Sequence, residues 1–313
     1  MILAMFKTQY RGRFAPSPTG ALHAGSLATA LGSWLDARAH QGKWLLRIED
    51  LDLPRCVPGA DKIIIQQLLN CGLHWDEEIE YQSKRIHFYE SALNQLKQEK
   101  KAYGCRCTRK QIEDQLLRLG KKKDRHSELV YPGSCRHLGD VTEPCAWRLL
   151  VTDPEIESSV GDFVLRRSDR IFTYQLAVVV DDHLQGITHV VRGEDLLDNT
   201  ARQIYLQQQL NYAQPHYLHL PLVLDENQEK LSKQTKATAI ACSTPGEALK
   251  ALQAAAKHLG LNEPSLFSES FDGSNRSNSS DSKEVNGPKV NESTIKQWLA
   301  SAVEHYRKTR LSV

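Results

Sequence analysis

Short apolar segments of strand type alternate with segments of helical period along the first hundred residues, and this alternation restricts the fold more than any other feature. We expect strands at 12–17 and 44–48, and helices at 24–40, 61–70 and 84–98. Parallel strands need a long crossover connection, which is usually a helix, so alternating strands and helices indicate a parallel sheet covered by helices. The sequence therefore predicts an α/β fold.

The alternation breaks between 103 and 144, where Cys, Lys, Arg and Gly are frequent, and we interpret this stretch as an inserted module. A further helix is expected at 201–210, and strand-like segments resume at 146–151, 162–166, 175–180, 188–192 and 217–224. We interpret the Asp181-Asp182-His183 group as turn and strand-end structure rather than a metal cluster. Ser, Asn, Asp and Gly dominate 265–293, which predicts a disordered linker, and an apolar stripe over 294–311 predicts a helix that docks back on the body.

Charge and hydropathy exclude several classes of protein. The chain has 40 Lys and Arg against 38 Asp and Glu, so any nucleic-acid partner must be held by local patches rather than by the bulk field. No apolar run approaches the ~20 residues of a membrane-spanning helix, so we expect no membrane partner. The N-terminus has no signal-peptide core, and the seven cysteines are odd in number and irregularly spaced. These features favour the reducing cytoplasm.

One candidate site is the segment RFAPSPTGALHAGS at 13–26, in which a strand, a Pro/Gly loop and a helix start follow one another. A helix N-terminus offers unpaired N–H groups to a phosphate, and Gly25 lets a ligand approach the backbone closely. His23 is placed to contact a phosphate or adenosine. The alternative interpretation is a capped helix with an incidental histidine.

A second candidate is the polar segment at 229–236, which contains Lys230, Lys233 and Lys236. Cations on such a loop can neutralise charge that develops on a triphosphate during reaction. Taken alone, the segment is typical of a solvated basic loop.

Together the two segments resemble the paired signatures of class I aminoacyl-tRNA synthetases, with KLSK at 230–233 as the second signature. Leu231 stands where the class signature usually has Met, and Ser26 occupies the fourth position of the first motif. The match extends to RFAPSPTGALHAGSL, LRIEDLD at 46–52 and YQLAVVVDDHLQGITHVVRGEDLLDNTARQ at 174–203. These tracts resemble the glutamyl-tRNA synthetase group over about 10–240.

Too few residues follow the KLSK segment for an anticodon-binding region, and a Cys-x-Cys insertion is present. In both respects the chain resembles the glutamyl-queuosine tRNA(Asp) synthetases. The resemblance implies that the chain activates L-glutamate with ATP to glutamyl-adenylate. Glutamate is then transferred to a cyclopentenediol hydroxyl of the queuosine base in the anticodon of tRNA(Asp). A monomer is expected.

The fold implied by the resemblance is a Rossmann-like catalytic domain with an inserted zinc-bearing subdomain and a short helical C-terminal region. The expected boundaries are 10–102 for the first half of the catalytic domain, 103–190 for the inserted subdomain, 191–260 for the second half, 265–293 for the linker and 294–313 for the C-terminal helix.

Glutamate has two carboxylates and one ammonium, so its pocket needs at least two cations and an anion. The resemblance makes Arg13 and Arg192 the carboxylate partners, Glu49 the partner of the ammonium, and Tyr174 a hydrogen-bonding group. The other implied residues of the L-glutamate site are Phe14, Ala15, Pro16 and Ser17. His23, Lys230 and Lys233 are implied as catalytic residues, and His23, Gly25 and Lys233 as the ATP-binding residues, with Mg²⁺ bound through the phosphates.

Cys105, Cys107 and Cys135 are three closely grouped thiols in a chain expected to be cytoplasmic, a pattern that favours zinc over disulfides. A tetrahedral zinc site needs a fourth donor. Proximity along the chain leaves His126, His137 and Cys145 as candidates, whereas the family resemblance implies Tyr131. Free buried cysteines without metal are the alternative.

Two other functions compete with this assignment. The chain would be a truncated glutamyl-tRNA synthetase if it charged the terminal ribose of tRNA(Glu) or tRNA(Gln). It would be a non-catalytic paralogue if it had the synthetase fold and bound tRNA but did not activate glutamate. The missing anticodon region argues against the first, and the presence of Arg13, His23, Glu49, Arg192 and Lys233 argues against the second.

Overall fold

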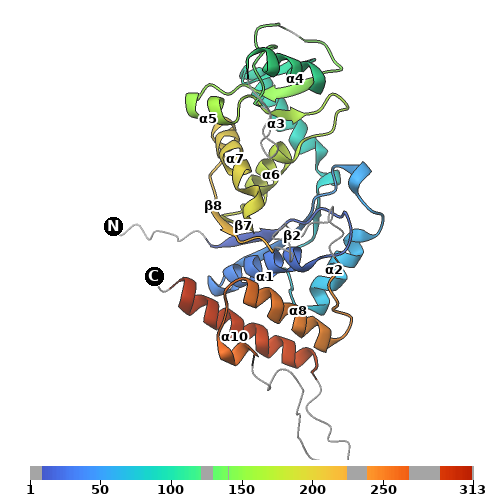
Figure 1. Ribbon diagram of the computed structural model, residues 1–313, viewed down its shortest axis with the longest axis vertical. Coiled ribbons are helices and arrows are strands. Elements are labelled where there is room, and N and C mark those ends of the chain that lie inside the picture. Colours follow the sequence, from blue (N-terminus) through green and yellow to red (C-terminus); the bar gives the residue numbers. More distant parts are fainter. Residues whose placement is uncertain (1–8, 121–129, 140, 224–237, 268–289, 312–313) are drawn as a thin grey trace, which may run out of the picture. The chain divides into compact units, whose positions relative to one another are not determined.

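The computed structural model describes residues 9–120, 130–139, 141–223, 238–267 and 290–311. The chain divides into two compact units, and Figure 1 labels most of their helices and some of their strands. Unit 1 contains Met1–Tyr81, Ile187–Leu197 and Pro215–Val313, and unit 2 contains Gln82–Gly186 and Asp198–Gln214. Unit 1 is thus built from segments far apart in the sequence.

Unit 1 has the predicted parallel strands. Strand β1 (Arg11–Phe14) pairs with β2 (Lys43–Ile48), which pairs with β3 (Glu80–Tyr81), and both pairs are parallel. Strands β7 (His189–Gly193) and β8 (His216–Leu220) form a second parallel pair. The Thr188 N–H donates to the Arg11 carbonyl at 2.9 Å, which places β7 beside β1.

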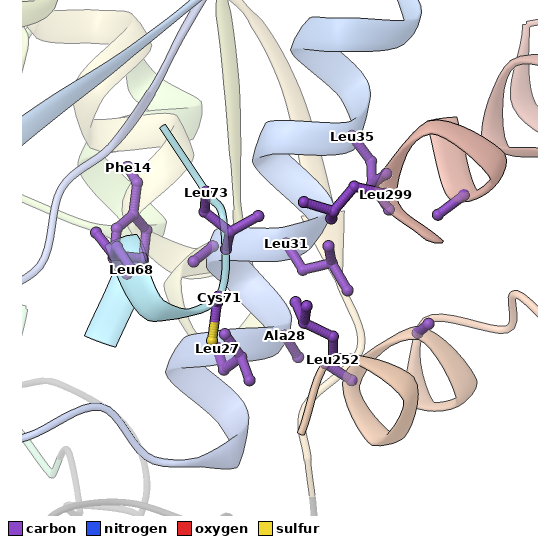
Figure 2. Packing of buried hydrophobic residues seen from close by; sticks show 14 of the residues in the cluster. Phe14, Leu27, Ala28, Leu31, Leu35, Leu68, Cys71, Leu73, Leu252 and Leu299 are labelled. Atoms are coloured by element: carbon purple, nitrogen blue, oxygen red, sulfur yellow. The ribbon is translucent and has the colours of Figure 1, made fainter. Parts of the chain in front are cut away.

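The described α-helices of unit 1 pack around its main apolar core, and a smaller cluster contains Leu45, Ile187 and Val190. These helices are α1 (Ala24–Ala39), α2 (Ala60–Asn70), α8 (Pro245–His258) and α10 (Glu292–Arg310). Short 3₁₀ turns lie at Leu53–Arg55, Glu194–Leu196 and Pro264–Phe267. Helix α1 is buried on several faces because it packs against β1 as well as α8 and α10. Figure 2 shows Leu35 beside Leu299, and Leu31 beside Leu252.

The C-terminal helix predicted at 294–311 is present as α10, and its apolar stripe is buried in the core of unit 1. Trp298 is completely buried, and its indole N–H donates to the Leu266 carbonyl at 2.8 Å. The stripe therefore docks on the body as expected. Most of the predicted linker, 268–289, lies outside the described residues.

Unit 2 contains an antiparallel sheet with the order β4 (Ala102–Cys105), β5 (Ala146–Leu149) and β6 (Val164–Arg166). Its helices are α3 (Ile86–Gln98), α4 (Arg109–Arg118), α5 (Pro154–Ser159), α6 (Tyr174–Leu184) and α7 (Leu197–Leu210), with a 3₁₀ turn at Gln82–Lys84. Helix α7 begins at the last residue of a unit 1 segment. The sequence did not predict α4, which begins with a capping box between Thr108 and Gln111.

The strand predicted at 175–180 is wrong, because these residues form most of helix α6. Every residue from Leu176 to Asp182 is buried, and a short continuous apolar run has no period by which a strand could be told from a helix. The interpretation of Asp181 as strand-end structure is wrong for the same reason. Its carboxylate is buried inside unit 2 and accepts hydrogen bonds from Arg85 Nε at 2.7 Å, Tyr89 OH at 2.7 Å and Gln82 Nε2 at 2.9 Å.

Among the described residues, a search for a helix both long and apolar enough to span a lipid bilayer finds none.

Candidate functional site

The end of β1 and the loop that follows it contain most of the residues predicted to bind glutamate. Arg13 is the third residue of β1, is 4% exposed and lies opposite Leu45 of β2. Phe14 ends the strand in the apolar core, with its ring stacked on that of Trp44. The chain then leaves the sheet through Ala15, Pro16 and Ser17, of which Ser17 is exposed. The loop thus follows a strand whose Arg13 is buried.

Glu49 follows β2 directly and is tied to the same loop. Its backbone N–H donates to the Pro16 carbonyl at 3.0 Å. Its carboxylate oxygen Oε1 lies 3.5 Å from an NH2 nitrogen of Arg47, a completely buried residue of β2. Glu49 is therefore an anion held beside the end of β1, and the buried guanidinium of Arg47 helps to set its position.

Arg192 is the fourth residue of β7 and is 3% exposed. Its guanidinium carbon lies 5.0 Å from the centroid of the Tyr217 ring, and its Nε donates to His219 Nε2 at 3.4 Å. Burial, and then the charge of Arg192, lower the pKa of His219 below its ordinary value. The imidazole therefore stays neutral at pH 7 and accepts the hydrogen bond from Arg192.

His23 is the N-cap of α1, so the alternative interpretation of this segment as a capped helix is correct as a description of its backbone. The Ser26 N–H donates to His23 Nδ1 at 3.3 Å, and the His23 N–H donates to Ser26 Oγ at 2.8 Å. Because Nδ1 accepts a hydrogen bond, the neutral ring has its proton on Nε2. Capping thus prepares Nε2–H as a donor, and Gly25 is the second residue of the helix.

Two residues that follow the KLSK segment lie beside His23 and Leu22. Ala239 forms an antiparallel bridge with His23, and the Ile240 N–H donates to the Leu22 carbonyl at 2.9 Å. Lys230 and Lys233 themselves lie outside the described residues. The segment that follows them is therefore anchored beside the start of α1.

Tyr174 is the first residue of α6 and is half-buried. It belongs to unit 2, whereas the other described residues predicted to bind glutamate or ATP belong to unit 1. The next residue, Gln175, accepts at Oε1 a hydrogen bond from Gln203 Nε2 at 3.1 Å, and this bond helps to attach the start of α6 to α7.

A separate cluster in unit 2 brings together the cysteines predicted to bind metal. The sulfur atoms of Cys105, Cys107 and Cys135 all lie within 4.8 Å of one another, and the Cys107 and Cys135 sulfurs are 3.4 Å apart. Tetrahedral zinc with Zn–S bonds of about 2.3 Å requires sulfurs about 3.8 Å apart. The cluster therefore has the dimensions of a thiolate metal site.

The hydroxyl of Tyr131 also lies in this cluster. The residue is 4% exposed, and its hydroxyl oxygen lies 3.4 Å from Cys105 Sγ and 3.5 Å from Cys107 Sγ. It also accepts from the Cys135 N–H at 3.0 Å. Among the competing donors, His137 is exposed and Cys145 contacts the Val141 carbonyl outside the cluster, while His126 lies outside the described residues.

The thiols of the cluster differ in acidity. Burial raises the pKa of Cys107 to about 11. Burial also raises the pKa of Cys135, but hydrogen bonds from the Tyr131 hydroxyl and the Arg106 backbone lower it more, so its pKa falls below the ordinary value. A metal cation would favour the thiolate form of all three. Three sulfurs and one phenolic oxygen suit zinc, which accepts sulfur and oxygen ligands in a tetrahedron.

Several buried charged residues around these sites were missed by sequence reasoning. Arg47 lies in the LRIEDLD tract, two residues before Glu49. Residues two apart on a strand point to the same face, so the sequence could have predicted the contact between these two side chains. Asp181 lies in the 174–203 tract. Arg148, which stacks on Tyr131, had no sequence signal, because the contact joins two segments of unit 2.

Comparison with known proteins gives one matching family model, described as "tRNA synthetases class I (E and Q), catalytic domain", over residues 9–144 and 140–262. Glutamyl-Q tRNA(Asp) synthetase from Albidiferax ferrireducens is 52% identical over 289 residues, which cover 81% of this chain and 93% of that protein. Glutamyl-Q tRNA(Asp) synthetase from Burkholderia orbicola is 54% identical over 270 residues, which cover 80% of this chain and 88% of that protein.

Two solved structures share the fold. The glutamate-tRNA synthetase from Elizabethkingia anophelis has a TM-score of 0.62 and 30% identity, with 72% of this chain and 53% of that chain covered. The glutamate tRNA ligase from Elizabethkingia meningosepticum, in complex with its amino acid, has a TM-score of 0.59 and 28% identity, with 72% and 52% covered. The chain spans about half the length of these two proteins.

Proposed function

Since this chain belongs to the class I tRNA synthetases of the E and Q type and, within them, to the glutamyl-Q tRNA(Asp) synthetases, we propose that it attaches L-glutamate to the queuosine base of tRNA(Asp). ATP activates the amino acid first. The acceptor is then a hydroxyl of the queuosine cyclopentenediol in the anticodon.

The observation that best supports this function is the charge pattern of unit 1. Arg13 and Arg192 are buried arginines on two strands, β1 and β7, and β7 lies beside β1. The carboxylate of Glu49 follows the end of β2 and is tied to the loop after β1. Two cations and one anion match the two carboxylates and the ammonium of glutamate. We assign Arg13, Ser17, Glu49, Tyr174 and Arg192 to glutamate, with Phe14, Ala15 and Pro16 shaping the loop.

The proposed reaction needs no nucleophile from the protein. A carboxylate oxygen of glutamate attacks the α-phosphorus of ATP, the bond to the β-phosphate oxygen breaks, and pyrophosphate leaves. The queuosine hydroxyl oxygen then attacks the carbonyl carbon of the adenylate, loses its proton, and releases AMP. Rate enhancement comes from positioning and from stabilising charge on the transferring phosphate.

His23 is the described residue best placed for that stabilisation. Its Nε2–H is fixed by the hydrogen bond at Nδ1, and the N-terminus of α1 adds partial positive charge. We assign Gly25 to close approach of ATP, and Lys233, supported by Lys230, to the phosphates. Mg²⁺, when bound through the phosphates, neutralises their charge.

We also propose that Cys105, Cys107, Tyr131 and Cys135 hold a structural zinc in an inserted subdomain. The donor set and its dimensions support this assignment. When bound, zinc would link strand β4, the turn after it and the 131–135 segment.

The test of the function is glutamate transfer by the purified protein with ATP and Mg²⁺, using queuosine-containing tRNA(Asp), unmodified tRNA(Asp) and tRNA(Glu) in parallel. Labelling only of the queuosine-containing tRNA is expected. Labelling of tRNA(Glu) would indicate a truncated glutamyl-tRNA synthetase instead. No labelling, together with no glutamate-dependent ATP–pyrophosphate exchange, would indicate a tRNA-binding paralogue. Size-exclusion chromatography of the same preparation tests the expected monomer.

A further inference from the structure

Arg148 of β5 is a buried cation that has no carboxylate partner among the described residues. The residue is 8% exposed. Its NH1 donates to the backbone carbonyl of Asp162 at 2.9 Å, whereas its buried Nε has no hydrogen-bond partner in the described part of the chain. A buried charge is costly unless it is paired. This guanidinium therefore requires a negative neighbour.

Three other arginines of unit 2 each have such a neighbour. Arg85 pairs with Asp181 at 2.7 Å, and Arg136 pairs with Asp162 at 2.6 Å. Arg166, on the adjacent strand β6, pairs with Glu143. Each of these three arginines has a carboxylate partner, whereas the hydrogen bond of Arg148 goes to a backbone carbonyl. All four residues belong to the same unit.

The guanidinium of Arg148 lies against the thiol cluster. Its central carbon is 3.9 Å from the centroid of the Tyr131 ring, and the hydroxyl of that ring contacts the sulfurs of Cys105 and Cys107. A cation over an aromatic face is attracted by the ring, more strongly when both are desolvated. The stacked ring of Tyr131 thus links Arg148 to the cluster.

The charge of a metal-loaded cluster has the sign that Arg148 requires. Three thiolates and one Zn²⁺ sum to a charge of about −1, and a bound phenolate makes the sum about −2. A neutral set of thiols provides no such charge. We propose that Arg148 is the counter-ion of the metal centre and positions Tyr131 as its oxygen ligand, an inference that rests on the proposed zinc site.

Metal binding and the buried charge of Arg148 should therefore stabilise each other. The anionic centre compensates the charge of Arg148, and Arg148 in turn favours the anionic form of the ligands. Residues that support metal ligands in this way typically contribute 10- to 100-fold to metal affinity. The effect should depend on the positive charge as well as on the volume of the side chain.

The experiment measures zinc affinity of the full chain under reducing conditions, by competition with a chromophoric chelator. The variants are Arg148→Met, which removes the charge, and Arg148→Lys, which retains it. Arg166→Met is the matched control, because Arg166 also lies over an aromatic ring, that of Phe172, but already has Glu143 as its partner. We expect zinc affinity to fall by about 10- to 100-fold in Arg148→Met, less in Arg148→Lys and by under about twofold in Arg166→Met.

Cobalt substitution supplies a readout that a purely structural role would not change. Co²⁺ bound to thiolates absorbs visible and near-ultraviolet light, and loss of the oxygen ligand alters the bands. Arg148→Met is expected to shift the visible bands, while Arg166→Met leaves them as in the parent protein. If Arg148→Met does not fold, the comparison is made between Arg148→Lys and Arg148→Gln.

The outcomes separate the two proposals. A parent protein with less than about half an equivalent of zinc refutes the zinc site itself. A parent protein that binds zinc, together with Arg148 variants of unchanged affinity and unchanged cobalt spectrum, overturns the counter-ion role and leaves the zinc site standing. Equal loss in Arg148→Lys and Arg148→Gln would also overturn it, because charge would then not matter.

Discussion

The Ser26 backbone N–H donates a hydrogen bond to His23 Nδ1 at 3.3 Å, so the residue that caps helix α1 is also the residue assigned to the transferring phosphate. Nδ1 of the imidazole caps the helix, and Nε2 is the nitrogen that we propose contacts the phosphate. A substitution at His23 therefore removes two contributions at once, and they need separate measurement.

His23→Ala is expected to lower the rate of glutamate-dependent ATP–pyrophosphate exchange by about 10²- to 10³-fold, as loss of one preorganised donor does elsewhere. It should also destabilise the protein by about 1 kcal/mol through loss of the cap. His23→Asn restores a capping oxygen without an Nε2–H group. That variant should regain the stability in urea unfolding but not the exchange rate; recovery of both would remove His23 from catalysis.

Arg13→Ala should reduce glutamate-dependent exchange by about 10²- to 10³-fold, because one substrate carboxylate loses its buried charged partner. The measurement is exchange rate against glutamate concentration. Arg11→Ala is the matched control, since Arg11 lies on the same strand but its side chain pairs with Glu77 at 2.7 Å. Near-parental exchange in Arg13→Ala would place Arg13 outside the pocket.

Asp181→Ala should destabilise unit 2 by about 3–5 kcal/mol, because it leaves the buried guanidinium of Arg85 without its carboxylate. Urea unfolding followed by circular dichroism measures the loss. The double variant Arg85→Met/Asp181→Leu removes both charges and should recover much of the stability. A double variant as unstable as the single one would mean that the cost arises from packing rather than from the unpaired charge.

Acid should destabilise unit 1 through His189. Burial, then the neighbouring His216, lower its pKa to about 4, and its ring stacks between those of Tyr10 and His216, with His40 and the buried Asp36 nearby. The unfolded chain, with an ordinary histidine pKa of about 6.5, binds the proton more readily. The contribution of His189 to stability is therefore complete above about pH 6.5 and is lost as the pH falls towards 4.

The check on that prediction is the free energy of unfolding measured between pH 7 and pH 4.5. His189→Phe retains an aromatic ring and should flatten the pH dependence. His74→Gln, at an exposed histidine of the same unit, should leave the dependence as it is in the parent protein. An unchanged slope in His189→Phe would assign the acid sensitivity to other groups.

Metal removal should loosen the thiol cluster of unit 2. Chelation under reducing conditions, or the substitution Cys107→Ser, is expected to lower the unfolding temperature and to increase the reactivity of the remaining cysteines towards a thiol reagent. Cys56→Ser, outside the cluster in unit 1, is the control. Equal thiol reactivity before and after chelation would argue for free cysteines.

The parallel strands of unit 1 and the capped start of α1 could be predicted because their signals are local. The apolar run in β2 indicates a buried strand, and the order of Pro, Gly and His residues marks the loop between β1 and α1. Helix α10 could be predicted because its apolar residues recur with a helical period, which is easily recognised after a long polar segment.

Helix α6 could not be predicted by the same means. Its residues 176–182 are all buried, so the apolar run has no period, and β-branched valines at 178–180 favour a strand locally. Tertiary packing decides the outcome. Two buried contacts could not be predicted for a related reason: those of Arg85 with Asp181 and of Arg148 with Tyr131. Each contact joins segments that are distant in the sequence and lie close together only in the folded chain.

The hydrogen bond from Thr188 to Arg11 joins residues 177 positions apart, and this has a consequence for biosynthesis. At a translation rate of about 5–20 residues per second, β7 is synthesised about 10–35 s after β1. The first segment of unit 2, Gln82–Gly186, is synthesised within that interval, and its second segment, Asp198–Gln214, follows β7. A nascent chain stalled before β7 would contain Arg13 and Glu49 without Arg192. If Arg13 and Arg192 bind glutamate as proposed, recognition depends on late synthesis, and premature termination yields a product that contains only one of these two arginines.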